Sequence, residues 1–246
     1  MLRLFLLSTA IMLCTSASAV TREEVEAGAE QLYRARITEA QQKYELDTHP
    51  AFLARVQRIA TRLNDQARRE YPATADLAWE IHATIDPDEN ASCMAGGKLL
   101  VGQRYVTKLE LNDAELAMLL SHEIEHAVLE HNLKEFREAL RLEPDRQQQA
   151  FAELEYAIDH DSALMSKLAA FDAAQESEAD RAGLLLASHA GWPPLGLVTY
   201  FKKMAHADPM SNFDSREHPS TARRWQAMRE LAKELDQQTV TVPAAK

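Results

Sequence analysis

The feature that most constrains the fold is a short apolar segment that also carries three histidines and three glutamates. Residues 118–131 read MLLSHEIEHAVLEH, in a chain with only 9 histidines among 246 residues. Apolar residues at helical spacing predict a helix with a substantial buried face. Burying imidazoles and carboxylates among such neighbours is costly unless they have partners. The fold must therefore bring partners to this helix, and a metal ion is one candidate.

Two histidines of this segment are spaced for a single metal ion. His122 and His126 are four residues apart, so on a helix both imidazoles project from one face, one turn apart. Glu123 projects to the side of such a metal, where its carboxylate can take a proton from water that the metal has acidified. This is the His-Glu-x-x-His pattern of zinc peptidases. The alternative interpretation is a solvated helix face that is rich in histidine, and the apolar neighbours argue against it.

A zinc ion that keeps one position open for water needs a third protein ligand. His131 follows His126 by five residues, which turns a helix by about 140°, so we predict that His131 is a supporting or structural histidine. The downstream segment QESEADRAG offers Glu176 and Asp180, four residues apart on one helix face. Glu176 can bind the metal while Asp180 accepts a hydrogen bond from a ligand imidazole. The competing interpretation of this segment is an ordinary acidic surface.

Long helices are predicted to dominate, because only 7 glycines and 9 prolines interrupt the chain. The helix that starts with a capping box at Asn112 and Glu115 is predicted to run toward Pro144. One β region stands out, formed by the alternating segment LAWEIHATID and by two short strands around Gly96 and Gly97. We therefore expect an α+β fold that is mainly helical, with one small β-sheet.

The second half of the chain also reads as helical. Residues 144–171 are polar with a helical pattern, and they are predicted to form a lid or an insertion. The segment around QESEADRAG is expected to be a separate helix that ends at Gly191, a residue suited to a C-terminal cap. A last helix is expected to begin near Pro219.

The N-terminus has the pattern of a cleavable secretory signal. Arg3 precedes the apolar run LFLLSTAIML, and small residues precede the predicted cleavage after Ala19. A lipoprotein anchored at Cys14 is disfavoured, because Leu13 stands where such signals have a small residue. We therefore predict that the protein is exported to the periplasm.

This processing divides the chain into a signal peptide, residues 1–19, and a single domain, residues 20–246. Cleavage leaves Cys93 as the only cysteine, which excludes an internal disulfide. No later run is long and apolar enough to span a bilayer. The formal net charge is -11 with no basic block, which argues against binding nucleic acid or an anionic membrane.

Four segments resemble metallopeptidase family 48, in the order in which that family has them. These segments are ASCMAGGKLLVGQRYV, LSHEIEHAVLEH, ESEADRAGLLLASHAGWPPLG and EHPSTARRW. The family includes CAAX prenyl proteases, the mitochondrial inner-membrane stress protease and bacterial periplasmic quality-control proteases. The resemblance implies a zincin-like metallopeptidase domain with one zinc ion per chain, and it implies Glu176 as the third ligand beside His122 and His126.

The resemblance implies further roles. Gly96 and Gly97 would lead into an edge strand that pairs with an extended substrate, which suits a protease of broad specificity. His218, in the segment EHPSTARRW, would lie close to the metal. There it would stabilise the oxyanion or occupy the open position as a resting fourth ligand. Arg223 or Arg224 is expected to orient this segment by pairing with a carboxylate.

Two positions depart from the pattern of that family. Glu125 stands where the family usually has Gly or Ala, so we expect it either to crowd a neighbouring element or to pair with a basic group. Cys93-Met94-Ala95 stand where the family tends to have an aromatic residue and a proline, which leaves the shape of the substrate groove open. For Cys93, a small buried apolar role is favoured over a nucleophile.

Together these features predict an exported zinc endopeptidase that hydrolyses extended or misfolded protein chains. Glu123 is the predicted general base, and then the proton donor to the leaving amine. The alternative is a chaperone-like protein that binds unfolded chains, with a structural zinc or a closed site. The intact Glu123 favours catalysis, because a binder needs no base there. A prenyl-protease function is disfavoured, because that branch of the family works from within transmembrane helices.

Overall fold

The computed structural model describes residues 20–212 and 219–241, so the predicted signal peptide and His218 lie outside the described residues. Helices dominate, and they are accompanied by one three-stranded sheet, as the predicted fold class requires. The elements in chain order are α1 (Arg22–Gln42), α2 (Pro50–Glu70), η1 (Pro72–Thr74), β1 (Glu80–Thr84), β2 (Ala91–Met94), β3 (Lys98–Gly102), α3 (Gln103–Lys108), α4 (Asp113–Val128), α5 (His131–Leu142), η2 (Pro144–Gln148), α6 (Phe151–His160), α7 (Ser162–His189), α8 (Pro194–Leu197), α9 (Thr199–Ala207) and α10 (Thr221–Thr241).

The sheet has the strand order β1-β3-β2, with β1 parallel and β2 antiparallel to β3. Gly96 and Gly97 both have a φ of 80° in the turn between β2 and β3, a conformation that glycine adopts without steric cost. The prediction that this glycine pair leads into an edge strand is wrong. It leads into β3, which is central because β1 pairs with its other side. The edge strand next to the helices is β2, which precedes the glycines.

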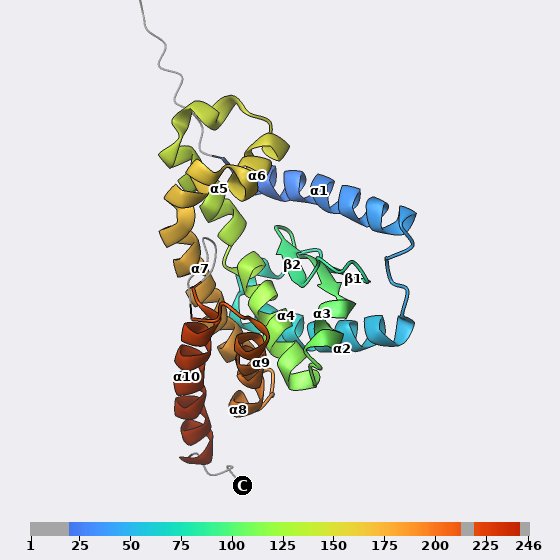
Figure 1. Ribbon diagram of the computed structural model, residues 1–246, viewed down its shortest axis with the longest axis vertical. Coiled ribbons are helices and arrows are strands. Elements are labelled where there is room, and N and C mark those ends of the chain that lie inside the picture. Colours follow the sequence, from blue (N-terminus) through green and yellow to red (C-terminus); the bar gives the residue numbers. More distant parts are fainter. Residues whose placement is uncertain (1–19, 213–218, 242–246) are drawn as a thin grey trace, which may run out of the picture.

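The helix α4 lies at the centre of the molecule, in contact with α2, α7 and the edge strand β2. Figure 1 shows the sheet between α1 on one side and α2 and α4 on the other. The apolar face predicted from the sequence is confirmed, since Leu116, Leu120 and Ile124 are completely buried at helical spacing. The polar face of α4 is thereby directed to a fixed position beside α7 and β2.

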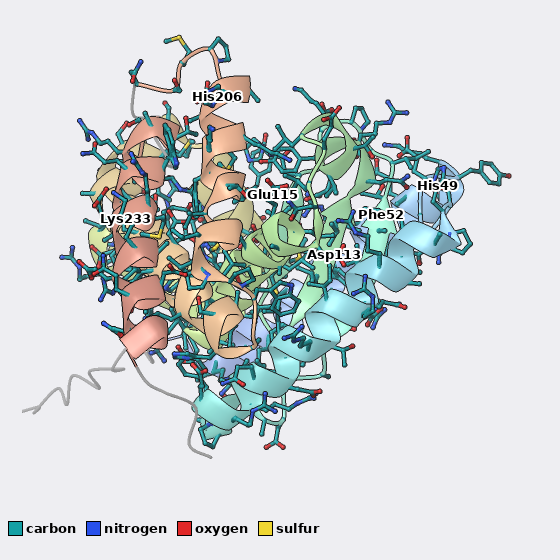
Figure 2. The ribbon with its side chains drawn as sticks, turned by 90° about the horizontal axis from the view of Figure 1, so that it is seen from below. His49, Phe52, Asp113, Glu115, His206 and Lys233 are labelled. Carbon is teal, nitrogen blue, oxygen red and sulfur yellow. The ribbon has the colours of Figure 1, made fainter. Side chains whose placement is uncertain are left out.

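The first turn of α4 is fixed from three sides. The predicted capping box is present, because Asn112 accepts from the N–H of Glu115 and the Glu115 carboxylate accepts from the N–H of Asn112. Glu115 also accepts from Lys203 of α9 at 2.7 Å. Asp113 accepts from Arg55 of α2 at 2.7 Å, and Figure 2 shows Asp113 beside that helix. The helix that carries the histidine motif therefore has a well-defined start.

The far end of α4 differs from the prediction of a continuous helix toward Pro144. The helix α4 ends at Val128, and α5 starts afresh at His131. Between them Glu130 has φ 57° and ψ 39°, a left-handed conformation that cannot continue a right-handed helix. The break turns the chain, so His131 belongs to a different helix from His126.

The helix α7 is also longer than predicted, with 28 residues from Ser162 to His189. The segment predicted as a lid or an insertion is divided among η2, α6 and the first part of α7. Gly183 lets α7 approach α4 closely, because a Cβ atom there would lie 2.9 Å from the backbone nitrogen of His122. Among the helices of the described ranges, none is long and apolar enough to cross a membrane.

Candidate metal centre

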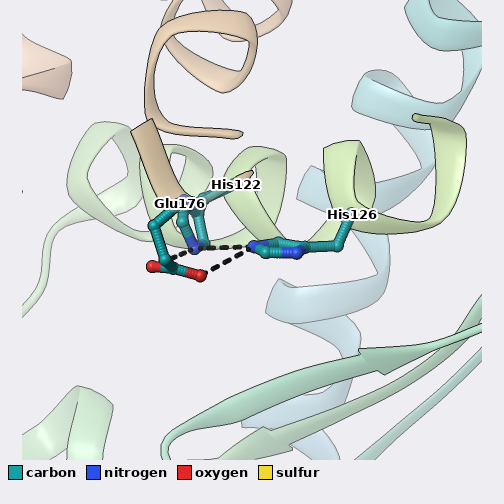
Figure 3. A group of neighbouring side chains, drawn as sticks. All are labelled: His122, His126 and Glu176. Atoms are coloured by element: carbon teal, nitrogen blue, oxygen red, sulfur yellow. Dashed lines mark hydrogen bonds and ion pairs between the residues drawn. The ribbon is translucent and has the colours of Figure 1, made fainter. Parts of the chain in front are cut away.

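Three side chains from two helices converge beside the sheet (Figure 3). His122 and His126 come from α4 and Glu176 from α7, and one ligand atom of each lies within 4.8 Å of the others. The two Nε2 atoms are 3.2 Å apart, and Glu176 oxygens lie 3.6 Å from His122 Nε2 and 3.2 Å from His126 Nε2. Ligand atoms of a tetrahedral zinc site with bonds of about 2.0–2.1 Å are about 3.3–3.4 Å apart. The spacing therefore fits zinc.

The protonation of His122 is set by Asp180. The Nδ1 atom of His122 lies 2.9 Å from Asp180 Oδ1, so Nδ1 carries the proton and Nε2 carries a lone pair. This is the supporting role predicted for Asp180 from its spacing to Glu176. It leaves the Nε2 atom of His122 ready to bind a cation.

His126 adopts the same tautomer, with the proton on Nδ1, through a neighbouring histidine. Its Nδ1 atom lies 3.1 Å from His131 Nδ1, and His131 Nε2 lies 3.2 Å from the carboxylate of Glu178. Burial and the nearby His126 lower the pKa of His131 to about 4, so His131 is neutral at pH 7. His131 therefore donates from Nε2 to Glu178 and accepts from His126 at Nδ1. The structure thus brings His131 into contact with the far nitrogen of a candidate ligand.

These hydrogen bonds decide what the centre can hold. The Nε2 atoms of His122 and His126 both present lone pairs, to each other and to the Glu176 carboxylate. Such a group of acceptors repels itself unless a cation lies between them. Two imidazoles and one carboxylate are a donor set that zinc prefers, and they leave a fourth position open. The three residues therefore fit the metal predicted from the sequence.

Arg224 of α10 contacts two carboxylates of this centre. Its guanidinium donates two hydrogen bonds of 2.7 Å to the carboxylate of Asp180, and Nη1 lies 3.3 Å from Glu176 Oε2. Burial alone would raise the pKa of Asp180, but Arg224 and His122 hold that pKa below its ordinary value. The sequence left Arg223 and Arg224 as alternatives, and the structure shows the bidentate pair with Arg224.

Glu123 lines a cleft of about 600 Å³ together with His122, His126 and Glu176. Burial raises the pKa of the Glu123 carboxyl to about 7; Glu176 adds to this rise and His122 opposes it. A carboxyl that titrates near neutral pH can both accept and return a proton. The position and the pKa of Glu123 therefore suit the role of general base.

The opposite wall of the cleft is the edge strand β2. Ala91, Ser92 and Cys93 line the cleft, and Cys93 is a buried side chain whose pKa is raised by burial. Tyr105 and Tyr200 also line it, with their hydroxyl oxygens 3.3 Å apart. Sequence reasoning missed both tyrosines: Tyr105 lies within one of the four segments that resemble the family, but nothing there singles it out, and Tyr200 lies in none of them.

Glu125 does not line the cleft. It is completely buried, and its carboxylate oxygens have no hydrogen-bond partner among the described residues. Burial, together with the nearby Glu70, raises the pKa of Glu125 to about 8, and Tyr71 opposes that rise. The described residues provide no basic partner, so the second of the two expectations for Glu125 is wrong. Its neutral carboxyl is accommodated against the end of α2.

Comparison with known proteins places this site in a family. The model of the family described as "Peptidase family M48" matches residues 50–232, most of the chain. The chain belongs to peptidase family M48. This membership confirms the predicted family and the predicted zincin-like metallopeptidase fold. The cluster of two histidines and one glutamate is where this chain can hold the zinc ion.

The similar curated proteins are larger than this chain. "Mitochondrial metalloendopeptidase OMA1" of Arabidopsis thaliana is 31% identical over 153 residues, which are 60% of this chain and 30% of the relative. The protein of the same name from Schizosaccharomyces pombe is 31% identical over 156 residues, 61% of this chain and 45% of the relative. The matches therefore span less than half the length of these two relatives.

Proposed function

We propose that the protein is an exported zinc endopeptidase of the periplasm that hydrolyses extended or misfolded protein chains. The observation that carries this proposal is the position of β2. This edge strand forms one wall of the cleft, and His122 and Glu123 form the facing part. A chain that pairs with a strand edge must be extended, and it is held by its backbone rather than by its side chains. Folded proteins do not offer such a segment, whereas unfolded ones do.

In the proposed mechanism Glu123 moves the protons. Zinc, when bound by His122, His126 and Glu176, supplies Lewis acidity that polarises the scissile carbonyl and makes water more acidic. Glu123 accepts a proton from the attacking water and returns it to the nitrogen of the leaving amine. Asp180 and Arg224 hold the His122 ring in position during this exchange. His218 is proposed to assist at the oxyanion or to rest as a fourth ligand.

Replacing Glu123 with glutamine tests this function. The Glu123→Gln variant keeps the shape of the side chain and loses the base, so casein digestion should fall by about 10²- to 10⁴-fold. Bound zinc should stay at one ion per chain, and binding of an unfolded chain should persist. The matched control is Glu125→Gln, two residues away and outside the cleft, which should retain activity. Digestion by Glu123→Gln at the wild-type rate would contradict the mechanism.

Two further outcomes concern the rest of the proposal. If the wild-type protein binds unfolded chains with zinc present but never cleaves them, the chaperone-like alternative is correct. The export proposal rests on the pattern of residues 1–19. The intact mass of protein recovered from a bacterial periplasm should correspond to a chain that begins after Ala19. A lipid-modified Cys14 would contradict this cleavage.

A further inference from the structure

A pair of tyrosines lies in the cleft beside Glu123 and has no part in the mechanism proposed above. Tyr105 belongs to α3 and Tyr200 to α9, and both line the cleft. Their hydroxyl oxygens are 3.3 Å apart. Tyr200 is 4% exposed, whereas Tyr105 is half-buried. Two helices that are far apart in the sequence thus bring two hydroxyl groups together at the wall of the cleft.

The pair carries one hydroxyl hydrogen more than its contact uses. Two hydroxyls have two hydrogens, their contact uses one, and the described residues offer neither oxygen another partner. An unpaired donor costs most where water cannot reach it, so the more buried Tyr200 is the donor. Burial raises the pKa of both hydroxyls, and the contact raises that of Tyr200 further while it lowers that of Tyr105, as this direction requires. The hydrogen of Tyr105 is the one that the described residues leave unused.

The strand edge that would hold a substrate in this cleft is short. The strand β2 has four residues, and successive residues of an antiparallel strand turn their backbone groups to opposite sides. The carbonyl of Asn90 accepts from Gly102 of β3, so the backbone groups of Ala91 and Cys93 face the open edge. Within β2 these two residues are the ones that can pair with a chain in the cleft. A substrate that runs past Ala91 therefore leaves the ladder of hydrogen bonds.

The tyrosine pair adjoins this end of β2. Val101 of β3 lies opposite Ala91, and α3 begins two residues after Val101. Tyr105 thus follows the end of β3 that neighbours Ala91, and both residues line the cleft. Next to burial, the charge of Arg224 affects the pKa of both hydroxyls more than that of Glu123 does. Since charge effects weaken with distance, the pair lies beside the scissile bond rather than at it.

We propose that Tyr105 binds the substrate by donating its hydroxyl hydrogen to a backbone carbonyl next to the scissile bond, and that Tyr200 positions Tyr105. The inference rests on the proposed endopeptidase function. An extended chain that has left the edge of β2 has carbonyls without donors, and the pair has a donor without an acceptor. Because this carbonyl does not react, the hydrogen bond is as strong in the ground state as in the transition state. It therefore lowers KM and leaves kcat unchanged.

Removing single hydroxyl groups tests the two roles. The substrate is a fluorogenic peptide that spans a cleavage site of casein. Zinc-loaded Tyr105→Phe should have a KM about five- to tenfold higher with an unchanged kcat, because one hydrogen bond to the substrate is lost. In Tyr200→Phe the donor remains but is no longer oriented, so KM should rise by about twofold. The double variant should match Tyr105→Phe. A lower kcat at unchanged KM in Tyr105→Phe would overturn the inference.

The matched control is Tyr44→Phe. Tyr44 is 86% exposed in the turn that follows α1, and it does not line the cleft. This variant should keep the KM and kcat of the wild type. Melting curves check that Tyr105→Phe and Tyr200→Phe fold. If Tyr200→Phe raises KM as much as Tyr105→Phe does, the two hydroxyls act only on the shape of the cleft, and the proposed roles are wrong.

A binding measurement separates this inference from the proposed function. Zinc-loaded Glu123→Gln protein is titrated calorimetrically with the casein-derived peptide and with versions that carry one thioamide near the scissile bond, so no turnover is needed. Sulfur is a weaker acceptor than oxygen. At one position the thioamide should therefore weaken binding about five- to tenfold, and should weaken it no further when Tyr105→Phe is added.

The two failures can be told apart. If the wild-type protein hydrolyses neither casein nor the peptide, the proposed function fails, and the binding measurement still decides the role of Tyr105. If every thioamide weakens binding equally with and without the Tyr105 hydroxyl, that hydroxyl does not contact a substrate carbonyl, and the inference is overturned whether or not the protein is a protease.

Discussion

The two candidate ligand histidines of α4 are held by different kinds of partner. His122 donates to Asp180, which is 1% exposed and forms a bidentate pair with the buried Arg224. His126 donates to the neutral His131, which in turn faces Glu178, a side chain that is 52% exposed. Both arrangements fix the same tautomer. Asp180 and Arg224 do so with buried charges, whereas His131 does so as a neutral ring whose own partner, Glu178, is exposed.

This difference predicts which substitutions should most affect stability and zinc affinity. Removing one member of a buried charge pair leaves the other charge desolvated, which is strongly destabilising. A hydrogen bond from a neutral ring to an exposed carboxylate contributes little, because water competes for the carboxylate and salt screens its charge. Substitutions of Asp180, the partner of His122, should therefore lower both stability and metal affinity. Substitutions of Glu178, at the surface beyond His126 and His131, should change either of them little.

The largest effect is expected for Asp180→Asn. The substitution removes the carboxylate that accepts two hydrogen bonds from the buried Arg224 and leaves only the longer contact with Glu176, so the free energy of unfolding should fall by about 3–5 kcal/mol. It also replaces the charged acceptor of the His122 Nδ1 proton with a neutral amide, so zinc affinity should fall by about 10- to 100-fold. Urea unfolding and zinc competition with a chelator measure the two effects.

A second substitution sharpens this prediction. In the double variant Asp180→Asn/Arg224→Gln the unpaired charge is gone, so its loss of stability should be clearly smaller than the sum of the two single losses. If the two losses simply add, the pair is not coupled, and the proposed contrast between the two histidines has no energetic basis.

A smaller effect is expected where α7 approaches α4. In Gly183→Ala the added Cβ would lie 2.9 Å from the backbone nitrogen of His122, and a backbone atom cannot move aside alone. The helices must separate slightly, which should cost about 1–3 kcal/mol and weaken zinc binding. Ser177→Ala, on an exposed part of the same helix, should change stability by less than about 0.5 kcal/mol. Equal effects of the two substitutions would show that the close approach is unimportant.

The parts of the site that depend on one helix could be predicted from the sequence. The spacing of His122 and His126 gives their common face directly, and the same holds for Glu176 and Asp180. The buried face of α4 follows from the spacing of its leucines, and its start from Asn112. In each case the relation is local, so helical geometry alone determines it.

The parts that depend on distant segments could not be predicted. The strand after Gly97, β3, is central because β1 pairs with it in parallel. The alternation of apolar and polar residues in the two strands does not indicate this pairing. The partner of Asp180 is Arg224, 44 residues away. The helix break at Glu130 has neither glycine nor proline to announce it.

Glu135 of α5, which lines the same pocket as His126, sharpens the comparison through pH. The pKa of Glu135 is raised to about 8 by burial and nearby carboxylates, above its ordinary value of 4.5. The folded state thus keeps a proton that the unfolded state has lost, so this contribution to stability is complete below pH 4.5 and disappears as pH rises through 8. Glu135→Gln should therefore flatten the decline and be more stable than wild type at pH 8, by on the order of 1–2 kcal/mol.

Unfolding by urea at pH 5, 6, 7 and 8 measures this slope. The control is Glu138→Gln on the same helix, because Arg141 lowers the pKa of Glu138 and no decline over this range is expected from it. A wild-type stability that is constant between pH 5 and 8, with Glu135→Gln parallel to it, would show that burial does not disfavour the ionised form of Glu135.

The smallest effects are expected along the outer end of the His126 side. His131→Ala removes the acceptor of the His126 Nδ1 proton, so zinc affinity should fall by about tenfold, the lower end of the range for such partners. Glu178→Gln keeps an acceptor oxygen at an exposed position and should change zinc affinity by less than about twofold. Chelator competition in the same buffer measures both. Glu178→Gln could instead weaken zinc binding as much as Asp180→Asn does. The charge of the exposed Glu178 would then matter as much as the charge of the buried Asp180, and burial would not distinguish the two partners.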